Sequence, residues 1–370
     1  MEYPENCSEY KGLTVNQGIE QPSSINPYFK DHKQTKKREL SVNDFVDGIL
    51  KGNITILSQA VTLVESIKSE HHAIAQEVIE KCLPYSGKSL RIGISGVPGA
   101  GKSTSIDVFG LHVLKKEGKL AVLAIDPSSE RSKGSILGDK TRMEQLSVHP
   151  RSFIRPSPSA GSLGGVARKT RETIILCEAA GFENIFVETV GVGQSETAVH
   201  SMVDFFLLIQ LAGTGDELQG IKRGVMEMAD GIVINKADGD NIDKARLAAT
   251  QFRNALHLFP APESGWIPQV LTYSGFYNIG VTEIWDMIYS YFDHVKANGY
   301  FEHRRNEQGK YWMYESINEQ LRNNFYNNES IKAGLREKEQ QVLNADLTSF
   351  VAARKLLDIY FEELKKGTRR

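Results

Sequence analysis

The segment from Gly96 to Ser103 reads Gly-Val-Pro-Gly-Ala-Gly-Lys-Ser, and it constrains the fold more than any other part of the chain. It fits the pattern G-x-x-x-x-G-K-[ST], which binds phosphate when it stands between a strand and a helix. An apolar run at 91–95 precedes the segment, and a helix-like segment at 104–114 follows it. The glycines allow backbone N–H groups to turn inward, where they and the helix N-terminus surround an anion. The sequence therefore predicts a nucleoside triphosphate site in a strand–loop–helix unit.

Two side chains of this loop have expected roles of their own. Lys102 is expected to neutralise the β- and γ-phosphates, and the Ser103 hydroxyl is expected to ligate Mg²⁺. The remaining contacts come from the backbone of the loop. The expected phosphate-binding residues are Gly96, Val97, Pro98, Gly99, Ala100, Gly101, Lys102, Ser103 and Thr104.

A second motif indicates which base is bound. The apolar run 229–233 leads into Asn-Lys-Ala-Asp, in which Asn235 is expected to steady the loop and the Lys236 stem to lie over the base. The Asp238 carboxylate can accept hydrogen bonds from N1–H and the 2-amino group of guanine, and adenine offers neither donor. Ser274, in a Thr-Tyr-Ser-Gly segment, is expected to belong to a second base-contacting loop. These features favour GTP over ATP.

Three acidic residues are predicted to complete the triphosphate site. Asp126 follows the strand-like run 120–125, and Glu188 lies at the end of another strand-like run. Mg²⁺ prefers oxygen ligands and commonly uses one or two carboxylates together with phosphate oxygens, so both are candidate ligands, directly or through water. Asp139 lies in a longer loop that is expected to close over the γ-phosphate as a switch and to contribute to the metal site. Lys102, Asp139 and Glu188 form the predicted catalytic set.

The middle of the chain alternates strand-like and helix-like segments. Such alternation is typical of an α/β fold, in which a mostly parallel sheet is covered by helices on both faces. Ligand-binding loops then lie at the carboxyl ends of the strands, where the motifs above occur. The chain is thus expected to be a P-loop NTPase with helical extensions at both ends. The strand-like runs are 91–95, 120–125, 184–189, 204–211, 230–234 and 268–273.

The sequence divides into four predicted regions. Residues 1–40 form a polar tail without fixed structure, and residues 41–86 form an N-terminal helical extension. Residues 87–291 form the nucleotide-binding domain. Residues 292–370 form a C-terminal helical extension with several amphipathic segments, which can either pack back on the domain or mediate dimerisation.

Composition limits the other classes of protein to which the chain could belong. The formal net charge is -2 over 370 residues, and no basic patch with interleaved aromatic residues suggests nucleic-acid binding. The longest apolar runs are too short to span a membrane. The three cysteines are scattered, which argues against a disulfide framework or a cysteine-based zinc site. A cytoplasmic location is the simplest expectation.

Five segments together give the chain a specific family resemblance. Their order and spacing resemble the MeaB/ArgK family of P-loop GTPases over roughly residues 41 to 365. The second and fourth segments are long, which makes the resemblance specific. In the third segment, Glu188-x-x-Gly191 stands where many GTPases have Asp-x-x-Gly. The five segments are Gly96–Thr104, Asp126–Met143, Val187–Glu196, Ala212–Gly224 and Asn235–Asp238.

The resemblance implies a function that the residues alone do not. It implies a GTPase chaperone of adenosylcobalamin-dependent methylmalonyl-CoA mutase, or of a related cobalamin-dependent acyl-CoA mutase, that gates cofactor delivery or protects the mutase. It implies a homodimer formed through helical extensions, and no cobalamin bound by this chain itself. Loops 127–142 and 189–200 resemble the first two switches of the family, and 211–222 resembles a third switch that contacts the mutase. The switch residues expected to contact this partner are Asp216, Glu217 and Lys222.

Other interpretations remain open from the sequence. Relatives of this kind have been described as kinases or ATPases of basic amino-acid transport, which would require an adenine site. A metal-insertion GTPase for another enzyme would share the fold, but it would be expected to carry a His-rich tract or a Cys-x-x-Cys site. A nucleotide-sensing scaffold, in which hydrolysis is incidental, is the third alternative.

Overall fold

A computed structural model of the chain describes residues 40–66, 68–115, 118–125, 143–157, 163–189, 195–212 and 223–367. Several residues singled out from the sequence lie outside these ranges. They are Asp126, Asp139, Asp216, Glu217 and Lys222, together with the tail 1–39.

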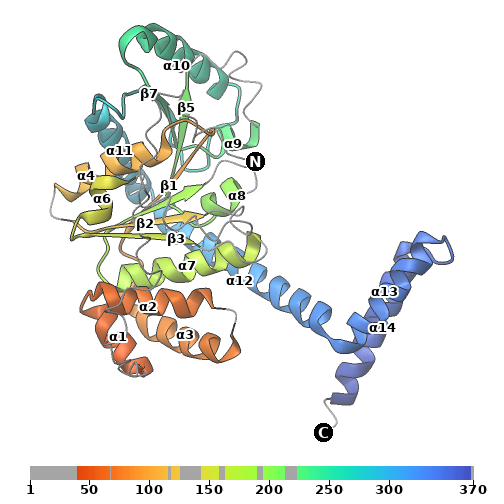
Figure 1. The fold of residues 1–370 in the computed structure, drawn as a ribbon. Coiled ribbons are helices and arrows are strands. Elements are labelled where there is room, and N and C mark those ends of the chain that lie inside the picture. Colours follow the sequence, from red (N-terminus) through yellow and green to blue (C-terminus); the bar gives the residue numbers. More distant parts are fainter. Residues whose placement is uncertain are drawn as a thin grey trace, which may run out of the picture. The chain divides into compact units, whose positions relative to one another are not determined.

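The core of the protein is a seven-stranded sheet in the order β3-β2-β4-β1-β5-β6-β7, and every pair of neighbouring strands is parallel. The predicted parallel α/β architecture is confirmed (Figure 1). Six of the strands correspond to the predicted runs, whereas β3 was not predicted. The strands are β1 Leu90–Gly96, β2 Leu120–Ile125, β3 Ser152–Ser157, β4 Asn184–Thr189, β5 Phe205–Leu211, β6 Gly231–Asn235 and β7 Gln269–Thr272.

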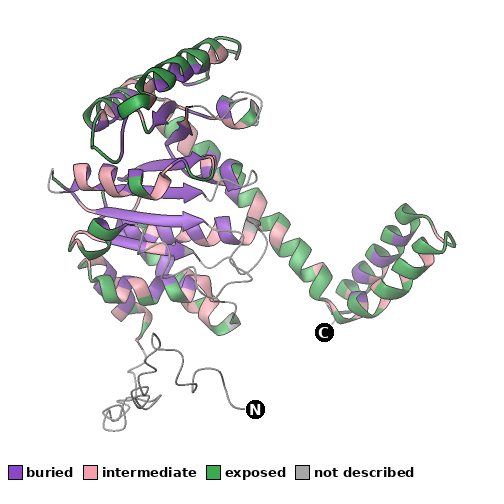
Figure 2. Ribbon diagram, turned by 45° about the horizontal axis from the view of Figure 1, so that its top comes forward, coloured by how far each residue is buried: buried purple, intermediate pink, exposed green. Residues whose placement is uncertain are grey.

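Helices cover both faces of this sheet. Successive residues of a strand point to opposite faces, so the two sides of β1 identify the two layers. Ile92 and Ile94 share a buried core with α4 (Lys102–Leu114) and α11 (Val281–Ala297). Gly93 faces Val199 of α8 (Ser195–His200) on the other side. Figure 2 shows the strands as the most buried layer between these helices.

Two long helices and three shorter ones complete the described residues of this part of the chain. The long helix α7 (Leu163–Ala179) packs on α8 and β2, and α10 (Ile242–Leu256) packs on β6 and β7. The shorter helices are α6 Glu144–Val148, α9 Arg223–Glu227 and η5 Gly239–Asn241.

Three helices precede the sheet, in the region where the sequence predicts a helical extension. They are α1 (Val42–Leu50), α2 (Ile54–Glu65) and α3 (Ser69–Cys82), followed by the short turn η3 (Leu83–Tyr85). Their apolar sides pack on one another and on α7. The carboxylate of Glu65 at the end of α2 forms an ion pair with Arg155 of β3, which ties this helical group to the edge of the sheet.

Three helices follow the sheet. They are α12 (Tyr300–Asn327), α13 (Glu329–Leu343) and α14 (Ser349–Gly367). The first half of α12 is hydrogen-bonded to the segment before β5, because Gln308 Nε2 donates to the Val203 carbonyl at 2.8 Å and Trp312 Nε1 donates to the Ser201 carbonyl at 3.0 Å. Helices α13 and α14 pair through a small core of Ile331, Leu356 and Tyr360.

Candidate nucleotide-binding site

The phosphate-binding motif forms a tight loop between β1 and α4, as its sequence predicts. At Gly96 a Cβ atom would lie 2.2 Å from the carbonyl oxygen of Ile209 on the neighbouring strand β5, so no side chain fits there. Gly99 and Gly101 have φ angles of +79° and +85°, which belong to the left-handed region that favours glycine. All three glycines of the motif are therefore required by the shape of the loop.

Lys102, the first residue of α4, folds back over this loop. Its Nζ donates to the carbonyl oxygens of Gly96 at 2.9 Å and Val97 at 3.4 Å. Burial lowers the pKa of the Lys102 ammonium, and the negative charges of Glu188 and Glu196 act in the opposite direction. The amine is therefore held by the backbone of the loop, and the negative charges of Glu188 and Glu196 favour its protonated form.

Glu188 reaches this place because β4 lies beside β1. The register of the two parallel strands pairs Ile94 with Glu188, two residues before the glycine that begins the phosphate loop. Glu188 is buried. The next residue, Thr189, donates a hydrogen bond from its hydroxyl to the Ser95 hydroxyl at 2.9 Å. The ends of β1 and β4 are thus joined directly at the candidate site.

Asn235 connects the base-reading motif to the phosphate loop. Its Nδ2 donates to the Ala100 carbonyl at 2.7 Å. Its Oδ1 accepts from the backbone N–H of Lys236 at 2.7 Å and of Gly275 at 3.1 Å. A Cβ atom on Gly101 would lie 2.6 Å from Asn235 Nδ2, which is a second reason for glycine at that position. One buried amide therefore holds three segments that are distant in sequence.

Asp238 and Ser274 are paired at the base-reading end of the site. The Ser274 hydroxyl donates to Asp238 Oδ2 and accepts from the Tyr277 backbone N–H at 3.2 Å. Lys236, two residues before Asp238, has a φ angle of +59°, uncommon for a residue with a side chain, and its carbonyl accepts from Asn241 Nδ2 at 2.7 Å. The loop thus has a defined shape in which the Asp238 carboxylate is held by a neighbouring hydroxyl.

The structure brings together the predicted residues that it describes. Lys102, Glu188, Asn235, Asp238 and Ser274 come from four different strand ends, and they meet at the carboxyl edge of the sheet because all strands are parallel. Strand β2, which leads to the predicted ligand Asp126, ends at Ile125 on the same edge.

Three contributors to the site were not assigned a role from the sequence. Glu196 of α8 is buried and acts on the charge of Lys102. Tyr273 and Ser105 are buried as well and share a hydrogen bond between their hydroxyl groups. Glu196 belongs to a segment that carries the family resemblance, whereas no local pattern marks the Tyr273–Ser105 contact.

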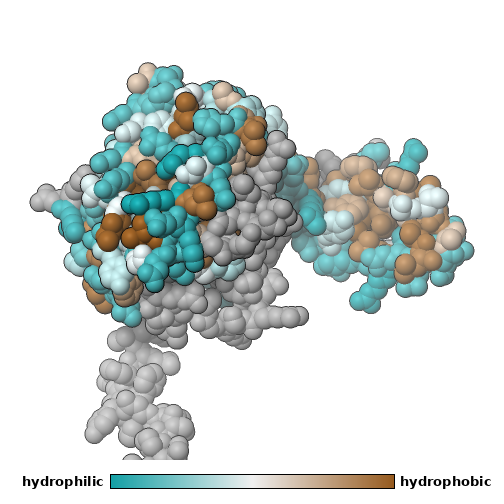
Figure 3. Space-filling view, turned by 90° about the horizontal axis from the view of Figure 1, so that it is seen from above, coloured by the Kyte–Doolittle hydropathy of each residue, from teal (hydrophilic) through white to brown (hydrophobic). Residues whose placement is uncertain are grey.

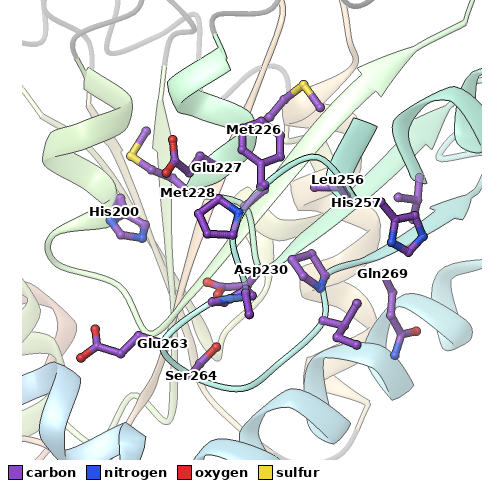
Figure 4. Close-up of a pocket in the computed structure, with 18 of the residues that line it drawn as sticks. His200, Met226, Glu227, Met228, Asp230, Leu256, His257, Glu263, Ser264 and Gln269 are labelled. Atoms are coloured by element: carbon purple, nitrogen blue, oxygen red, sulfur yellow. The ribbon is translucent and has the colours of Figure 1, made fainter. Parts of the chain in front are cut away.

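A separate cavity of about 1040 Å³ lies near the amino-terminal ends of strands β6 and β7. It is lined by residues of α9, the segment 256–271 and the first turn of α12, and none of the predicted nucleotide-binding residues takes part. Figure 4 shows Asp230 in the middle of this cavity, with His200 and Met228 on one side and His257 on the other. Burial, together with the charge of Arg304, lowers the pKa of His200 to about 3, so its imidazole is neutral at physiological pH.

The site and the sheet together define a P-loop GTPase. Residues 57–330 match the family described as "Methylmalonyl Co-A mutase-associated GTPase MeaB", and the chain belongs to this family. The enzyme hydrolyses GTP to GDP and phosphate, in agreement with the GTPase names of its relatives. None of the helices in the described ranges is both long enough and apolar enough to cross a membrane.

Named relatives and a solved structure agree with this family. The "Probable GTPase" of Mycobacterium tuberculosis is 46% identical over 321 residues, which are 86% of this chain and 96% of that protein. The "Methylmalonic aciduria type A homolog, mitochondrial" of Mus musculus is 41% identical over 362 residues, which are 95% of this chain and 87% of that protein. A crystal structure described as "LAO/AO transport system kinase" has a TM-score of 0.70 and 36% identity, and covers 86% of this chain and 97% of its own.

Proposed function

We propose that this GTPase is a chaperone of adenosylcobalamin-dependent methylmalonyl-CoA mutase, or of a related cobalamin-dependent acyl-CoA mutase, and that its nucleotide state gates cofactor loading and protects the mutase. The family description names this mutase, and a mouse relative carries the name of a methylmalonic aciduria protein. The GTPase cycle is supported most directly by the hydrogen bonds of Asn235, which join the phosphate loop to the base-reading loops.

Each end of the nucleotide has proposed partners. The backbone of residues 96–104 binds the phosphates, and Lys102 offsets charge on the β- and γ-phosphates as the bond to the γ-phosphoryl group breaks. Asp238 reads guanine, and the Ser274 hydroxyl keeps that carboxylate in place. The Lys236 stem lies over the base, and Asn235 keeps the loops together. In the hydrolysis step a water oxygen bonds to the γ-phosphorus, GDP leaves, and Glu188 holds or orients that water.

The oxygen groups at the phosphate end fit a Mg²⁺ ion. The Ser103 hydroxyl at the start of α4 and the Glu188 carboxylate at the end of β4 are hard oxygen donors of the kind that Mg²⁺ takes. Within the described ranges no group of three or more His, Cys, Asp and Glu forms a protein-only cage. A bound Mg²⁺ would take its other ligands from phosphate oxygens and water, and it would supply positive charge that offsets the charge of the phosphates. Asp126 and Asp139 are proposed to contribute as well, and both lie outside the described residues.

We propose that the C-terminal helices form a homodimer. Helices α12 to α14 expose many large apolar side chains, and Figure 3 shows hydrophobic groups gathered on the surface of this helical region. Large exposed apolar patches commonly mark protein–protein contacts. The exposed side chains are Tyr311, Met313, Tyr314, Ile317, Leu321, Tyr326, Leu343, Phe350, Val351, Leu357, Phe361 and Leu364.

The division of the chain is also proposed to follow function. Residues 41–86 are the N-terminal extension, 87–291 the nucleotide-binding domain and 292–370 the dimerisation region, although α11 continues to Ala297. We propose that the protein acts in the cytoplasm. Contact with the mutase is assigned to Asp216, Glu217 and Lys222, which lie outside the described residues.

The deciding experiment measures GTP turnover with and without purified methylmalonyl-CoA mutase. A switch requires different partner affinities in its states, so mutase binding must differ between GDP and a non-hydrolysable GTP analogue. By reciprocity, the mutase must then change the affinity for nucleotide. If the mutase binds in neither nucleotide state and leaves turnover unchanged, the chaperone proposal fails while the GTPase assignment stands.

A second candidate function follows from the name of the solved relative. A kinase or ATPase of basic amino-acid transport transfers phosphate to an acceptor or hydrolyses ATP, whereas the chaperone hydrolyses GTP. Incubation with radiolabelled ATP or GTP, with and without arginine or lysine, separates these outcomes. Label on an acceptor other than water, or faster ATP than GTP turnover, would favour the transport function.

A further inference from the structure

The backbone of Tyr273 is built into the base-reading loop. Its N–H donates to the Ile234 carbonyl at 3.0 Å, and its own carbonyl accepts from the Ala237 N–H at 3.0 Å. These bonds lie on either side of Asn235 and Lys236. The following residue, Ser274, holds the Asp238 carboxylate. A displacement of Tyr273 would therefore move the loops at which guanine is read.

The side chain of Tyr273 reaches the helix that follows the phosphate loop. Its ring is 1% exposed and packs on Phe109 of α4, with 5.4 Å between the ring centroids. Its hydroxyl contacts the Ser105 hydroxyl, and Ser105 Oγ donates to the Gly101 carbonyl at 2.7 Å. A serine hydroxyl has only one proton, so Tyr273 is the donor in its bond to Ser105. Burial raises the pKa of the Tyr273 phenol, which keeps that proton in place.

The chain of hydrogen bonds ends at the last glycine of the phosphate loop. Gly101 stands directly before α4 in a left-handed conformation, and its carbonyl also accepts from the Ser105 N–H at 2.9 Å. A trans peptide is planar, with its C=O and N–H pointing in opposite directions. Fixing the Gly101 carbonyl therefore fixes the direction of the Lys102 N–H, one of the amides at the helix N-terminus that face an anion.

We propose that Tyr273 is a positioning residue that determines base specificity, because it couples guanine recognition at Asp238 to the geometry of the phosphate loop through Ser105. This inference rests on the proposed assignment of Asp238 as the guanine reader. It goes beyond that assignment, since neither Tyr273 nor Ser105 touches the base in the proposed roles. Hydrogen bonds in such a chain polarise one another, so loss of one member is felt at both ends.

The test compares the affinities of GDP and inosine diphosphate, which differ only by the 2-amino group of the base. Competition against a fluorescent guanine nucleotide gives the GDP-to-IDP affinity ratio for the wild type, Tyr273→Phe, Ser105→Ala and the double variant. We expect each single variant to lower this ratio at least about threefold, which is the scale of one hydrogen bond. The double variant should match Ser105→Ala, because that single variant already removes both the contact with Tyr273 and the bond to the Gly101 carbonyl.

Tyr291→Phe is the matched control. Tyr291 is fully buried, and its hydroxyl donates to the Asp204 carbonyl at 2.9 Å. Asp204 comes just before β5, so this bond lies at the amino-terminal ends of the strands, away from the nucleotide motifs. This variant also removes a buried phenol hydroxyl, together with the bond that it accepts from Arg304 Nη1 at 3.1 Å, so it should leave the affinity ratio unchanged even if it lowers stability.

Asp238→Asn separates failure of this inference from failure of the base assignment. If Asp238→Asn leaves the ratio unchanged, the base assignment fails, and with it the inference about Tyr273. If Asp238→Asn lowers the ratio but Tyr273→Phe and Ser105→Ala weaken both nucleotides equally, the Tyr273 hydroxyl serves packing alone and the inference is overturned. Ser105→Ala is the smaller change, so it decides the question where Tyr273→Phe does not fold.

Discussion

Asn235 Nδ2 lies 2.7 Å from the Ala100 carbonyl oxygen, so the base-reading motif is hydrogen-bonded directly to the phosphate loop. In a trans peptide, a fixed Ala100 carbonyl also fixes the direction of the Gly101 N–H. One side chain therefore orients an amide of the loop 96–103 and, through Gly275, the segment that contains Ser274.

Asn235→Ala should weaken binding of both GDP and ADP. The variant leaves the Ala100 carbonyl and the Gly275 N–H without their side-chain partner, and each unpaired buried group costs about 1–3 kcal/mol. We expect at least a tenfold loss of GDP affinity, about the scale of one such group, in a fluorescent-nucleotide titration. Unaltered GDP affinity would show that the bridge has no part in nucleotide binding.

Asp238→Asn should change the choice of base. An amide at this position presents a donor to the guanine N1–H, so GDP loses affinity while ADP does not. The ratio of GDP to ADP affinity should fall by about tenfold or more, which is the cost of one mispaired buried group. The measurement is a competition titration with both nucleotides, and equal affinity of the wild type for GDP and ADP would already contradict the assignment.

Glu188→Gln should slow hydrolysis more than it weakens GDP binding. The substitution keeps the shape of a buried side chain but removes the charge proposed to act at the metal and the attacking water. General-base and electrostatic contributions of this kind are worth about a hundredfold or more. Single-turnover hydrolysis measures the effect. Glu183→Gln, an exposed carboxylate just before the same strand, is the control that should hydrolyse GTP at the wild-type rate.

His200→Gln should make folding less sensitive to acid. In the folded protein the pKa of His200 is about 3, below its ordinary value of 6.5, so the unfolded chain binds the additional proton between these values. The stability that neutral His200 provides is present above pH 6.5 and is lost as the pH falls toward 3. Over that window, the binding of one proton by the unfolded chain lowers the free energy of unfolding by up to about 1.4 kcal/mol for each pH unit.

Urea unfolding at a series of pH values tests this expectation. The variant should show a shallower fall in unfolding free energy than the wild type as the pH is lowered. Equal slopes for His200→Gln and the wild type would mean that the imidazole is not kept neutral by burial.

The sequence predicted those parts of the site that depend on local backbone requirements. Gly96, Gly99 and Gly101 are required by loop shape, and Glu188 follows an apolar run that signals a strand end. The predicted fold was correct except for β3, a six-residue strand with a proline. Because β3 is at the sheet edge and pairs only with β2, a proline is tolerated there, and neither length nor composition marks it.

Contacts between distant residues could not be predicted in the same way. Tyr273 and Ser105 are 168 residues apart, and Arg305 and Asp204 are 101 residues apart. A tyrosine just after a strand and a serine in a helix are ordinary in both places, so neither residue signals its partner. Only the parallel pairing of the strands and the packing of α4 and α12 bring these residues together.

Arg305→Ala should destabilise the nucleotide-binding domain although Arg305 lies far from the nucleotide motifs in the fold. Its guanidinium donates to Asp204 Oδ2 at 2.7 Å and to the Ser89 carbonyl at 2.7 Å, and the Asp204 side chain is 2% exposed. The Asp204 carboxylate also accepts a hydrogen bond from the backbone N–H of Arg91 at 2.9 Å. Removing the cation leaves a buried carboxylate uncompensated, which costs about 3–5 kcal/mol. The free energy of unfolding in urea should fall by that amount, with the GDP-bound and nucleotide-free proteins affected alike.

Lys310→Ala, which breaks an exposed pair with Glu307 on the same helix, should have little effect. If the two variants are equally stable, the attachment of α12 to the start of β5 does not depend on this ion pair.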